Sequence, residues 1–393
     1  MGRSVILGGA RTAFGKLGGA LAEKSAVELG AIAGAAAIAR AGVEPSEIDH
    51  IFMGQVLQAG NGQIPSRQVG FQIGLDREVT SDTLNRVCGS GMRAVTMADI
   101  FIRSGEYRTI LAGGMESMSN APYMLPKARF GYRLGDGTLV DSMVSDGLTC
   151  AVAHVHMGVH GSNVAAEEEC SREAQDAFAL RSHQRVIAAY ESGAMAEEIV
   201  PVELRDRRGA VTLFDRDESP RADTSLEALA KLRPVFSPTG SVTAGNAPGV
   251  NDGAAALVLT SEEHARELGL RPLATVIAHA TSAWDVPYLA YVPAMAAQTA
   301  LQKANLTISD MEVVEINEAF ASVALISASR LGLDADQVNP NGGAVALGHP
   351  IGASGARLVL TLAYELRRRG GGFGLAAICS GGAQGDAIII RVD

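Results

Sequence analysis

The sequence predicts a layered α/β fold built from two similar halves. Short apolar strands such as 108–114 and 252–260 alternate with helical runs such as 26–42, which is the pattern of helices packed on sheets. The run 90–105 also has the period of a helix, but Met, Val, Ile and Phe cover most of its circumference. A helix that is apolar all round is buried, so we expect this one to lie between two sheets.

The two halves are predicted from an internal repeat. Residues 40–54 align without a gap on residues 303–317, and both segments have the pattern of a helix end, a turn and a strand. With nearly the same shift along the chain, residues 90–95 align on residues 354–359. Because separate segments agree on one shift, we expect a duplicated unit.

Length and composition agree with two packed units in a globular chain. A chain of 393 residues exceeds the size at which a single core keeps growing, and 47% hydrophobic against 19% charged residues gives no sign of disorder. The formal net charge of -10 argues against a general attraction to nucleic acid or to anionic membranes. Neither is therefore expected as a partner, and local contacts would have to hold any anionic ligand.

The amino terminus predicts a buried strand rather than a targeting signal. Residues 1–19 contain a short apolar run that ends in glycines, without the apolar core or cleavage site of a signal peptide. No stretch of 18 apolar residues predicts a transmembrane helix. The cysteines are far apart in the sequence and fit neither a disulfide framework nor a zinc site: Cys88, Cys150, Cys170 and Cys379. We expect a reducing compartment, the cytoplasm.

A more polar stretch separates the two halves. Residues 118–249 are richer in charge and in loops than the rest of the chain, so we expect them to form an inserted lobe. The N-terminal half would then comprise residues 1–117 plus 250–267, and the C-terminal half residues 268–393.

Cys88 is the first candidate for chemistry. It stands in NRVCGSGMRA directly before the expected buried helix, where unpaired N–H groups and the helix dipole lower the pKa of a thiol and favour the thiolate. Gly89 and Gly91 permit a close approach of the backbone. The alternative is that Cys88 is a small buried hydrophobic residue, which is the usual place of a free cysteine.

Three further residues stand at positions suited to catalysis. His349 lies in a loop of glycines and prolines, which would present its imidazole as a fixed base or bond it to backbone carbonyls. Cys379 ends a strand and precedes SGGAQG, whose glycines would either expose N–H groups to an oxyanion or simply form a hairpin turn. Asn317 follows the strand EVVEI and opens the run EAFASVALISASRLG, where capping a helix would be explanation enough.

Six motifs follow one another along the chain: NRVCGSGMRAV, GGMESMS, TAGNAPGVNDGAAA, EINEAFA, NGGAVALGHPIGASGAR and CSGGAQG. In sequence and in order they resemble the thiolase family, specifically its acetyl-CoA C-acetyltransferases. Because they span nearly the whole chain, the match is far more specific than any one Gly-rich loop. The resemblance implies the duplicated five-layer αβαβα fold of thiolases, with an inserted loop domain that serves CoA binding and tetramer assembly.

The resemblance also implies a role for each candidate residue. Cys88 would be the nucleophile that carries the acyl group, His349 its general base, and Cys379 the second acid and base. Asn317 would hold a water in an oxyanion hole, and the backbone N–H groups of Cys88 and Gly381 would form another. The implied reaction is the reversible, ping-pong condensation of two acetyl-CoA to acetoacetyl-CoA and CoA, or thiolysis of a 3-oxoacyl-CoA. CoA is then substrate or product, and no cofactor is needed.

For coenzyme A, the resemblance implies a nucleotide contact and a channel for the pantetheine arm. Arg221 would lie near the nucleotide. The arm would be surrounded by Leu148, His156, Met157, Leu232, Phe236, Ala244, Ala319 and Phe320. Pro248 stands where the family usually has a serine, and residues 284–295 depart from the family's pattern, so the shape of the acyl pocket stays open.

Several alternatives remain at this stage. The nearest is a degradative 3-ketoacyl-CoA thiolase of broader chain length. A condensing synthase of the same fold would pair its cysteine with two histidines or with a glutamate and a histidine, so Cys379 favours a thiolase. A catalytically silent acyl-CoA-binding protein would lack one of the four reactive residues, and all four are present. No metal is expected, because His154, His156 and His160 share no helical face. The resemblance implies a homotetramer, a dimer of dimers.

Overall fold

Helices and strands alternate throughout residues 2–393, which the computed structural model describes. The helices are α1 (Ala26–Ala41), α2 (Pro65–Ile73), α3 (Ser90–Ser104), α4 (Met157–Glu167), α5 (Arg172–Glu191), α6 (Ala194–Glu198), α7 (Leu226–Ala230), α8 (Glu262–Glu267), α9 (Val292–Ala304), α10 (Ala321–Arg330), α11 (Ala344–Leu347) and α12 (Ser354–Arg368). The strands are β1 (Ser4–Thr12), β2 (Gly15–Lys16), β3 (His50–Gly54), β4 (Thr80–Leu84), β5 (Thr109–Ser117), β6 (Tyr123–Met124), β7 (Val140–Asp141), β8 (Ile199–Val200), β9 (Val202–Arg205), β10 (Val211–Phe214), β11 (Asn251–Ser261), β12 (Ala274–Ala283), β13 (Met311–Ile316), β14 (Gly372–Ser380) and β15 (Gln384–Val392). Within this described part of the chain, no helix is long and apolar enough to cross a membrane.

The longer strands lie along one hydrogen-bonded path that divides into two sheets at a narrow seam. Hydrogen bonds join them in the order β13-β14-β15-β12-β1-β11-β5-β3-β4. Between β1 and β12 the pairing consists of Val5–Thr275 and Ile6–Ala274 in the described residues. Between β1 and β11 it extends over most of both strands. The seam between β1 and β12 therefore divides the path into two parts that can face each other.

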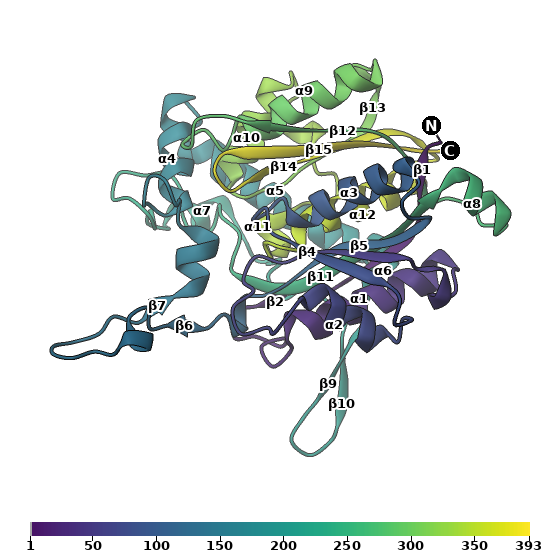
Figure 1. The fold of residues 1–393 in the computed structure, drawn as a ribbon. Helices are drawn as coiled ribbons and strands as arrows, with labels where there is room; N and C mark the ends of the chain where they lie inside the picture. The colour runs from purple at the N-terminus through teal and green to yellow at the C-terminus, as the bar shows by residue number, and fades with distance from the viewer. Residues whose placement is uncertain (1) are drawn as a thin grey trace.

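Figure 1 shows the resulting five layers. Helices α1 and α2 cover the outer face of the sheet that contains β5 and β11, and α9 and α10 cover the outer face of the sheet that contains β14 and β15. Helices α3 and α12 lie between the sheets and contact both of them. In α12 every residue from Ser354 to Leu366 is buried. Helix α3 lies between the sheets as predicted, but it is less enclosed than α12, because Ile100 and Arg103 near its C-terminal end are exposed.

The two sheets repeat one arrangement, as the internal repeat predicts. Strand β3 runs parallel to β5, and β13 runs parallel to β14. In each sheet the next strand toward the seam is antiparallel, β11 in one and β15 in the other. Helices α3 and α12, which begin with the aligned segments 90–95 and 354–359, pack against each other. The predicted duplication and the five-layer α/β fold are confirmed.

The stretch between residues 118 and 249 contains the helices α4 to α7, the β9–β10 hairpin and a projecting arm with the β6–β7 pair at its base (Figure 1). It is not separate from the layers. Strand β8 pairs in parallel with the end of β1, and α5 packs against α10 and α11. The loops of this stretch are thereby held against the edge where both sheets end.

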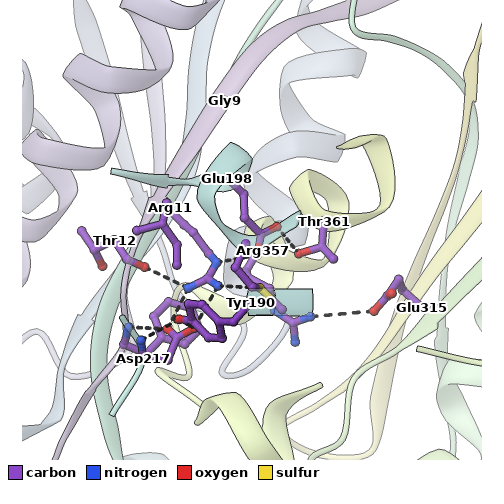
Figure 2. Close-up of polar contacts among 12 residues, drawn as sticks. Gly9, Arg11, Thr12, Tyr190, Glu198, Asp217, Glu315, Arg357 and Thr361 are labelled. Carbon is purple, nitrogen blue, oxygen red and sulfur yellow. Dashed lines mark hydrogen bonds and ion pairs between the residues drawn. The ribbon is translucent and has the colours of Figure 1, made fainter. Parts of the chain in front are cut away.

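Buried ion pairs tie this stretch to the layers (Figure 2). The Arg11 guanidinium on β1 lies 2.8 Å from a carboxylate oxygen of Glu198 and 2.8 Å from one of Asp217. Tyr190 donates a hydrogen bond to Asp217 at 2.7 Å, and Thr361 on α12 donates one to Glu198 at 2.7 Å. A buried arginine is tolerated when its charge is matched in this way.

A second buried pair in Figure 2 is looser. Arg357 on α12 and Glu315 on β13 are both buried, and the closest nitrogen and oxygen are 3.8 Å apart. Burial raises the pKa of Glu315 to about 8, although the charge of Arg357 acts in the opposite direction. Near neutral pH, Glu315 therefore holds a proton in a large fraction of molecules.

Candidate active site

Two glycines bring the first turns of α3 and α12 into direct contact. A Cβ atom on Gly91 would lie 2.7 Å from the backbone nitrogen of Ala356, and one on Gly355 would lie 2.3 Å from that of Met92. Both distances are shorter than real Cβ contacts, so only glycine permits this crossing. The loop before α3 carries Cys88, and the crossing places it beside the loop before α12.

The loop before α12 presents His349 to Cys88. His349 Nε2 lies 3.1 Å from Cys88 Sγ, and His349 Nδ1 lies 2.7 Å from the hydroxyl oxygen of Ser354. Ser354 donates its one hydroxyl proton to the carbonyl of Pro350 at 3.0 Å, so it accepts a hydrogen bond from Nδ1. Nδ1 therefore carries the proton of the neutral imidazole, and the lone pair of Nε2 faces the thiol.

Two residues fix the backbone of the His349 loop, and the sequence reasoning singled out neither. Asn251, at the start of β11, accepts a hydrogen bond from the His349 backbone N–H at 3.0 Å. Glu116, at the end of β5, accepts one from Gly352 at 2.9 Å. A Cβ at Gly348 would lie 2.4 Å from Asn251 Nδ2, which leaves no room for another residue type. Both polar residues stand inside the quoted motifs, TAGNAPGVNDGAAA and GGMESMS, which is the signal that points to them.

Burial sets the protonation of both groups. It lowers the pKa of His349 to about 3, with a further contribution from the positive charge of Arg357. Burial also raises the pKa of Cys88 well above its usual range, and the neighbouring Cys379 adds to this effect. The expectation that the helix start lowers the pKa of Cys88 is therefore wrong, because desolvation outweighs the helix dipole. In this site a neutral thiol faces a neutral imidazole.

Cys379 lines the cavity into which Cys88 and His349 also face. It stands near the end of β14, is buried, and pairs with Gly385 across the hairpin formed with β15. The expected hairpin turn is thus present, and the cysteine and Gly381 both line the cavity beside Cys88. Burial raises the pKa of Cys379 to about 12. A thiol of this kind holds its proton firmly, and its thiolate is a strong base.

Asn317 does not cap a helix. The next helix, α10, begins at Ala321, and Phe320 precedes it without a side-chain cap. The Asn317 amide is fully buried, and neither its nitrogen nor its oxygen has a hydrogen-bond partner among the described residues. An unpaired buried amide costs about 1–3 kcal/mol. The capping interpretation is therefore wrong, and Asn317 is not among the residues that line the cavity of Cys88 and His349.

Cys88, Cys379 and His349 line an apolar cavity of about 450 Å³. Six residues expected around the pantetheine arm line it: Leu148, His156, Met157, Phe236, Ala319 and Phe320. Arg221, Leu232 and Ala244 do not line it, and Arg221 is exposed on the surface. Pro248 and Leu289, from the two segments that depart from the thiolase pattern, are part of the wall.

Stacked aromatic rings form one side of the cavity. The rings of His156 and Phe236 are stacked with centroids 4.1 Å apart, and Phe236 meets Phe320 edge to face at 6.3 Å. His156 Nδ1 accepts a hydrogen bond from the Gly158 backbone and so caps α4. His156 is thus a structural part of the wall. Within residues 2–393, no group of three or more His, Cys, Asp or Glu side chains is placed to hold a metal ion.

The fold is a duplicated five-layer α/β fold, and its cavity brings Cys88, His349 and Cys379 together. The family model described as "Thiolase, N-terminal domain" matches residues 4–263, and that described as "Thiolase, C-terminal domain" matches residues 270–392. The chain belongs to the thiolase family.

Curated relatives match over nearly the full length. A protein of Chromobacterium violaceum named acetyl-CoA acetyltransferase is 48% identical over 386 residues, which are 98% of this chain and 98% of the relative. A protein of Escherichia coli with the same name is 48% identical over 392 residues, covering 100% of this chain and 99% of the relative. One of Cupriavidus necator, again so named, is 47% identical and covers 98% of each chain.

Proposed function

We propose that this enzyme is an acetyl-CoA C-acetyltransferase, which condenses two acetyl-CoA to acetoacetyl-CoA and CoA and catalyses the reverse thiolysis. The observation that carries the proposal is the contact of Cys88 with the lone pair of His349, 3.1 Å apart, with Cys379 in the same cavity. The names of the relatives support the substrate.

In the first half-reaction, Cys88 attacks the thioester carbonyl of acetyl-CoA while His349 takes the thiol proton. Because both groups are neutral in the resting site, proton transfer accompanies attack. The tetrahedral intermediate then expels CoA as a thiolate, which receives the proton of Cys379. Acetyl-Cys88, protonated His349 and a Cys379 thiolate remain.

In the second half-reaction, the Cys379 thiolate takes an α-proton from another acetyl-CoA. Burial, which makes this thiol a poor acid, makes its thiolate basic enough for the weakly acidic α-carbon. The enolate attacks the acetyl-Cys88 carbonyl, acetoacetyl-CoA forms, and Cys88 leaves as a thiolate that recovers its proton from His349. Each group returns to its starting state.

Two sets of donors stabilise the negative oxygens in this mechanism. The backbone N–H groups of Cys88 and Gly381 are assigned to the tetrahedral intermediates. Protonated His349 and a water held by Asn317 are assigned to the enolate. The unpaired buried amide of Asn317 supports this role. Donors fixed before the reaction are worth about 10²- to 10³-fold in rate each.

Coenzyme A is assigned to the cavity and the surface next to it. The pantetheine arm would run along Phe236 and Phe320, and the nucleotide would reach the exposed Arg221. The loop domain 118–249 would supply most of these contacts. We place the boundary between the N- and C-terminal halves at residues 267 and 268, which agrees with the gap between the two matched family domains.

Assembly and location complete the proposal. We assign a homotetramer, supported by the arm between β6 and β7, where Phe130 and Leu134 are 87% and 99% exposed. Apolar side chains exposed to this degree on one projecting arm are typical of a surface that a partner covers. All four cysteines are free thiols, which supports a location in the cytoplasm.

The proposal is tested by incubating the enzyme with acetyl-CoA alone, followed by intact-mass analysis and peptide mapping. We expect one acetyl group, on Cys88, because a ping-pong enzyme forms a stable intermediate without the second substrate. An acetyl group on Cys379, or none, would refute the assignment. Steady-state thiolysis of 3-oxoacyl-CoA of increasing length then separates an acetoacetyl-CoA enzyme from a thiolase of broader chain length.

The two cysteines are distinguished by exchange of the α-protons of acetyl-CoA with heavy water. Cys379→Ser should retain acetylation of Cys88 and lose most of the exchange, since a serine hydroxyl is a far weaker acid than a thiol. Exchange as fast as in the unmodified enzyme would show that another group, with His349 the first suspect, takes the α-proton.

A further inference from the structure

The segment that carries Cys88 is fastened to the hairpin that carries Cys379. Arg86 Nε lies 2.9 Å from a carboxylate oxygen of Asp386 on β15. The Ser380 hydroxyl donates a hydrogen bond to the backbone carbonyl of Arg86. The side chain and the backbone of one residue, two positions before the nucleophile, are thus both held by the opposite hairpin.

The residues on either side of Cys88 continue this contact. A Cβ on Gly381 would lie 2.5 Å from a methyl carbon of Val87, so Val87 packs directly on the Gly381 backbone. Val87 itself has a positive φ of 45°, a conformation that a β-branched residue adopts only when its surroundings impose it. A Cβ on Gly89 would lie 2.8 Å from the Asp386 carboxylate. The two segments therefore fit together without spare room.

Asp386 is the buried centre of this contact. Its carboxylate is enclosed between the strands and α3, and the charged or titratable groups that face it are Arg86 in the loop, Arg93 on α3 and His279 on β12. Burial raises its pKa to about 6 against the attraction of these cations. The chemistry proposed above uses neither Asp386 nor Arg86. A buried charge pair is costly, so its position between the two catalytic segments calls for an explanation.

We propose that Arg86 and Asp386 are positioning residues that fix the distance between the two backbone N–H donors of the oxyanion hole, those of Cys88 and Gly381. One donor belongs to each segment, and both must point at the same oxygen. A shift of about 1 Å between the segments takes one donor out of bonding distance and costs up to about 100-fold in rate. The inference rests on the proposed function, because it assigns a role within that reaction.

The test compares two reactions of the same thiol in Arg86→Met, Asp386→Asn and the double variant. Acetylation of Cys88 by acetyl-CoA in a single turnover requires the oxyanion hole. Alkylation of Cys88 by iodoacetamide, quantified by peptide mapping, requires the thiol and His349 but no oxyanion. We expect acetylation and the kcat of thiolysis to fall about 10- to 100-fold in each variant, while the alkylation rate and KM stay within about 3-fold.

The double variant distinguishes an effect on the backbone donors from a loss of the folded state. Arg86→Met leaves a buried carboxylate without its partner, whereas Arg86→Met with Asp386→Asn removes both charges and should have the higher melting temperature. Its acetylation rate should be no lower than that of Asp386→Asn alone, because two residues that act as one unit are not additive. Arg205→Met, which breaks the exposed pair of Arg205 with Glu203 in the β9–β10 hairpin, is the matched control.

Two results would overturn the inference. In the first, acetylation stays within about twofold of the unmodified enzyme in all three variants. In the second, acetylation and alkylation fall together by the same factor, which would mean that the pair supports the fold and not the geometry of the donors. If the unmodified enzyme is not acetylated by acetyl-CoA at all, the proposed function fails instead, whatever the variants do.

Discussion

Ser354 determines which nitrogen of His349 carries a proton. In Ser354→Ala the Nδ1–H group loses its acceptor, so the imidazole can adopt the other tautomer, which cannot take a proton from Cys88. We expect the kcat of thiolysis to fall about 10- to 100-fold with little change in KM. Ser327→Ala, which removes a buried hydroxyl bonded to the Ala290 carbonyl, is the control. If kcat were unchanged, the tautomer would have to be fixed by another group.

The structure places in one cavity three candidate residues that local motifs indicate, while their catalytic roles stay predictions. Cys88, His349 and Cys379 each stand in a Gly-rich segment, so their neighbours in the sequence indicated them. Their pKa values were not predictable, because burial depends on the packing of segments far apart in the chain. Asn317 shows the same limit: its place after a strand suggested a cap, but the chain runs through three more residues, the last of them Phe320, before α10 begins.

The crossing of α3 and α12 is the element on which the site depends. In Gly355→Ala the new methyl group would meet the backbone nitrogen of Met92, which cannot move aside as a side chain can. We expect a melting temperature lower by roughly 3–10 °C and a kcat lower by about tenfold or more. Gly34→Ala on α1 is the control, since its methyl would meet only the ends of the Ile73 and Leu111 side chains. A fall in stability without a fall in kcat would contradict the proposed coupling.

Most elements could be predicted because local patterns determine them. Helix α1 covers all but the last residue of its expected range, and it ends there because Gly42 adopts the left-handed conformation. The repeat of 90–95 in 354–359 predicted that α3 and α12 correspond. The seam between β1 and β12 and the short strand β8 were not predictable, because they depend on pairing between distant segments rather than on local sequence.

The buried charges of the whole molecule make its stability depend on pH. Glu315 has a pKa of about 8 in the folded chain, against about 4.3 in an unfolded one. The folded chain retains a proton that the unfolded chain releases between these values. The proton on Glu315 therefore contributes to the free energy of unfolding in full below about pH 4. This contribution decreases toward pH 8, by up to about 1.4 kcal/mol per pH unit.

Glu315→Gln cannot titrate, so its melting temperature should fall less than that of the unmodified enzyme between pH 5.5 and pH 8. Any constant cost of the amide is the same at each pH and does not alter this difference. Glu227→Gln, on the exposed face of α7, is the control. Parallel curves for the two proteins, measured by differential scanning calorimetry, would contradict the raised pKa of Glu315.

The arm between β6 and β7 predicts how the molecules assemble. Replacing Phe130 and Leu134 by serine should convert the proposed tetramer into dimers at micromolar concentration, because these two apolar side chains are almost fully exposed in the single chain and a partner would cover them. Multi-angle light scattering measures the change. Leu213→Ser, at a leucine on β10 that is 61% exposed, should leave the proposed tetramer intact. A monomer in the unmodified enzyme would refute the assembly.

The pairing of β1 determines when this strand can join the sheet while the chain is being synthesised. All nine residues of β1 are buried, and its long partner strand, β11, begins at Asn251. At about 5–20 residues per second, a ribosome needs on the order of 10–50 s to reach that point. Until then β1 has only the short strand β8 to pair with, which covers no more than Arg11 and Thr12. Most of β1 therefore stays unpaired until well over half of the chain has been made.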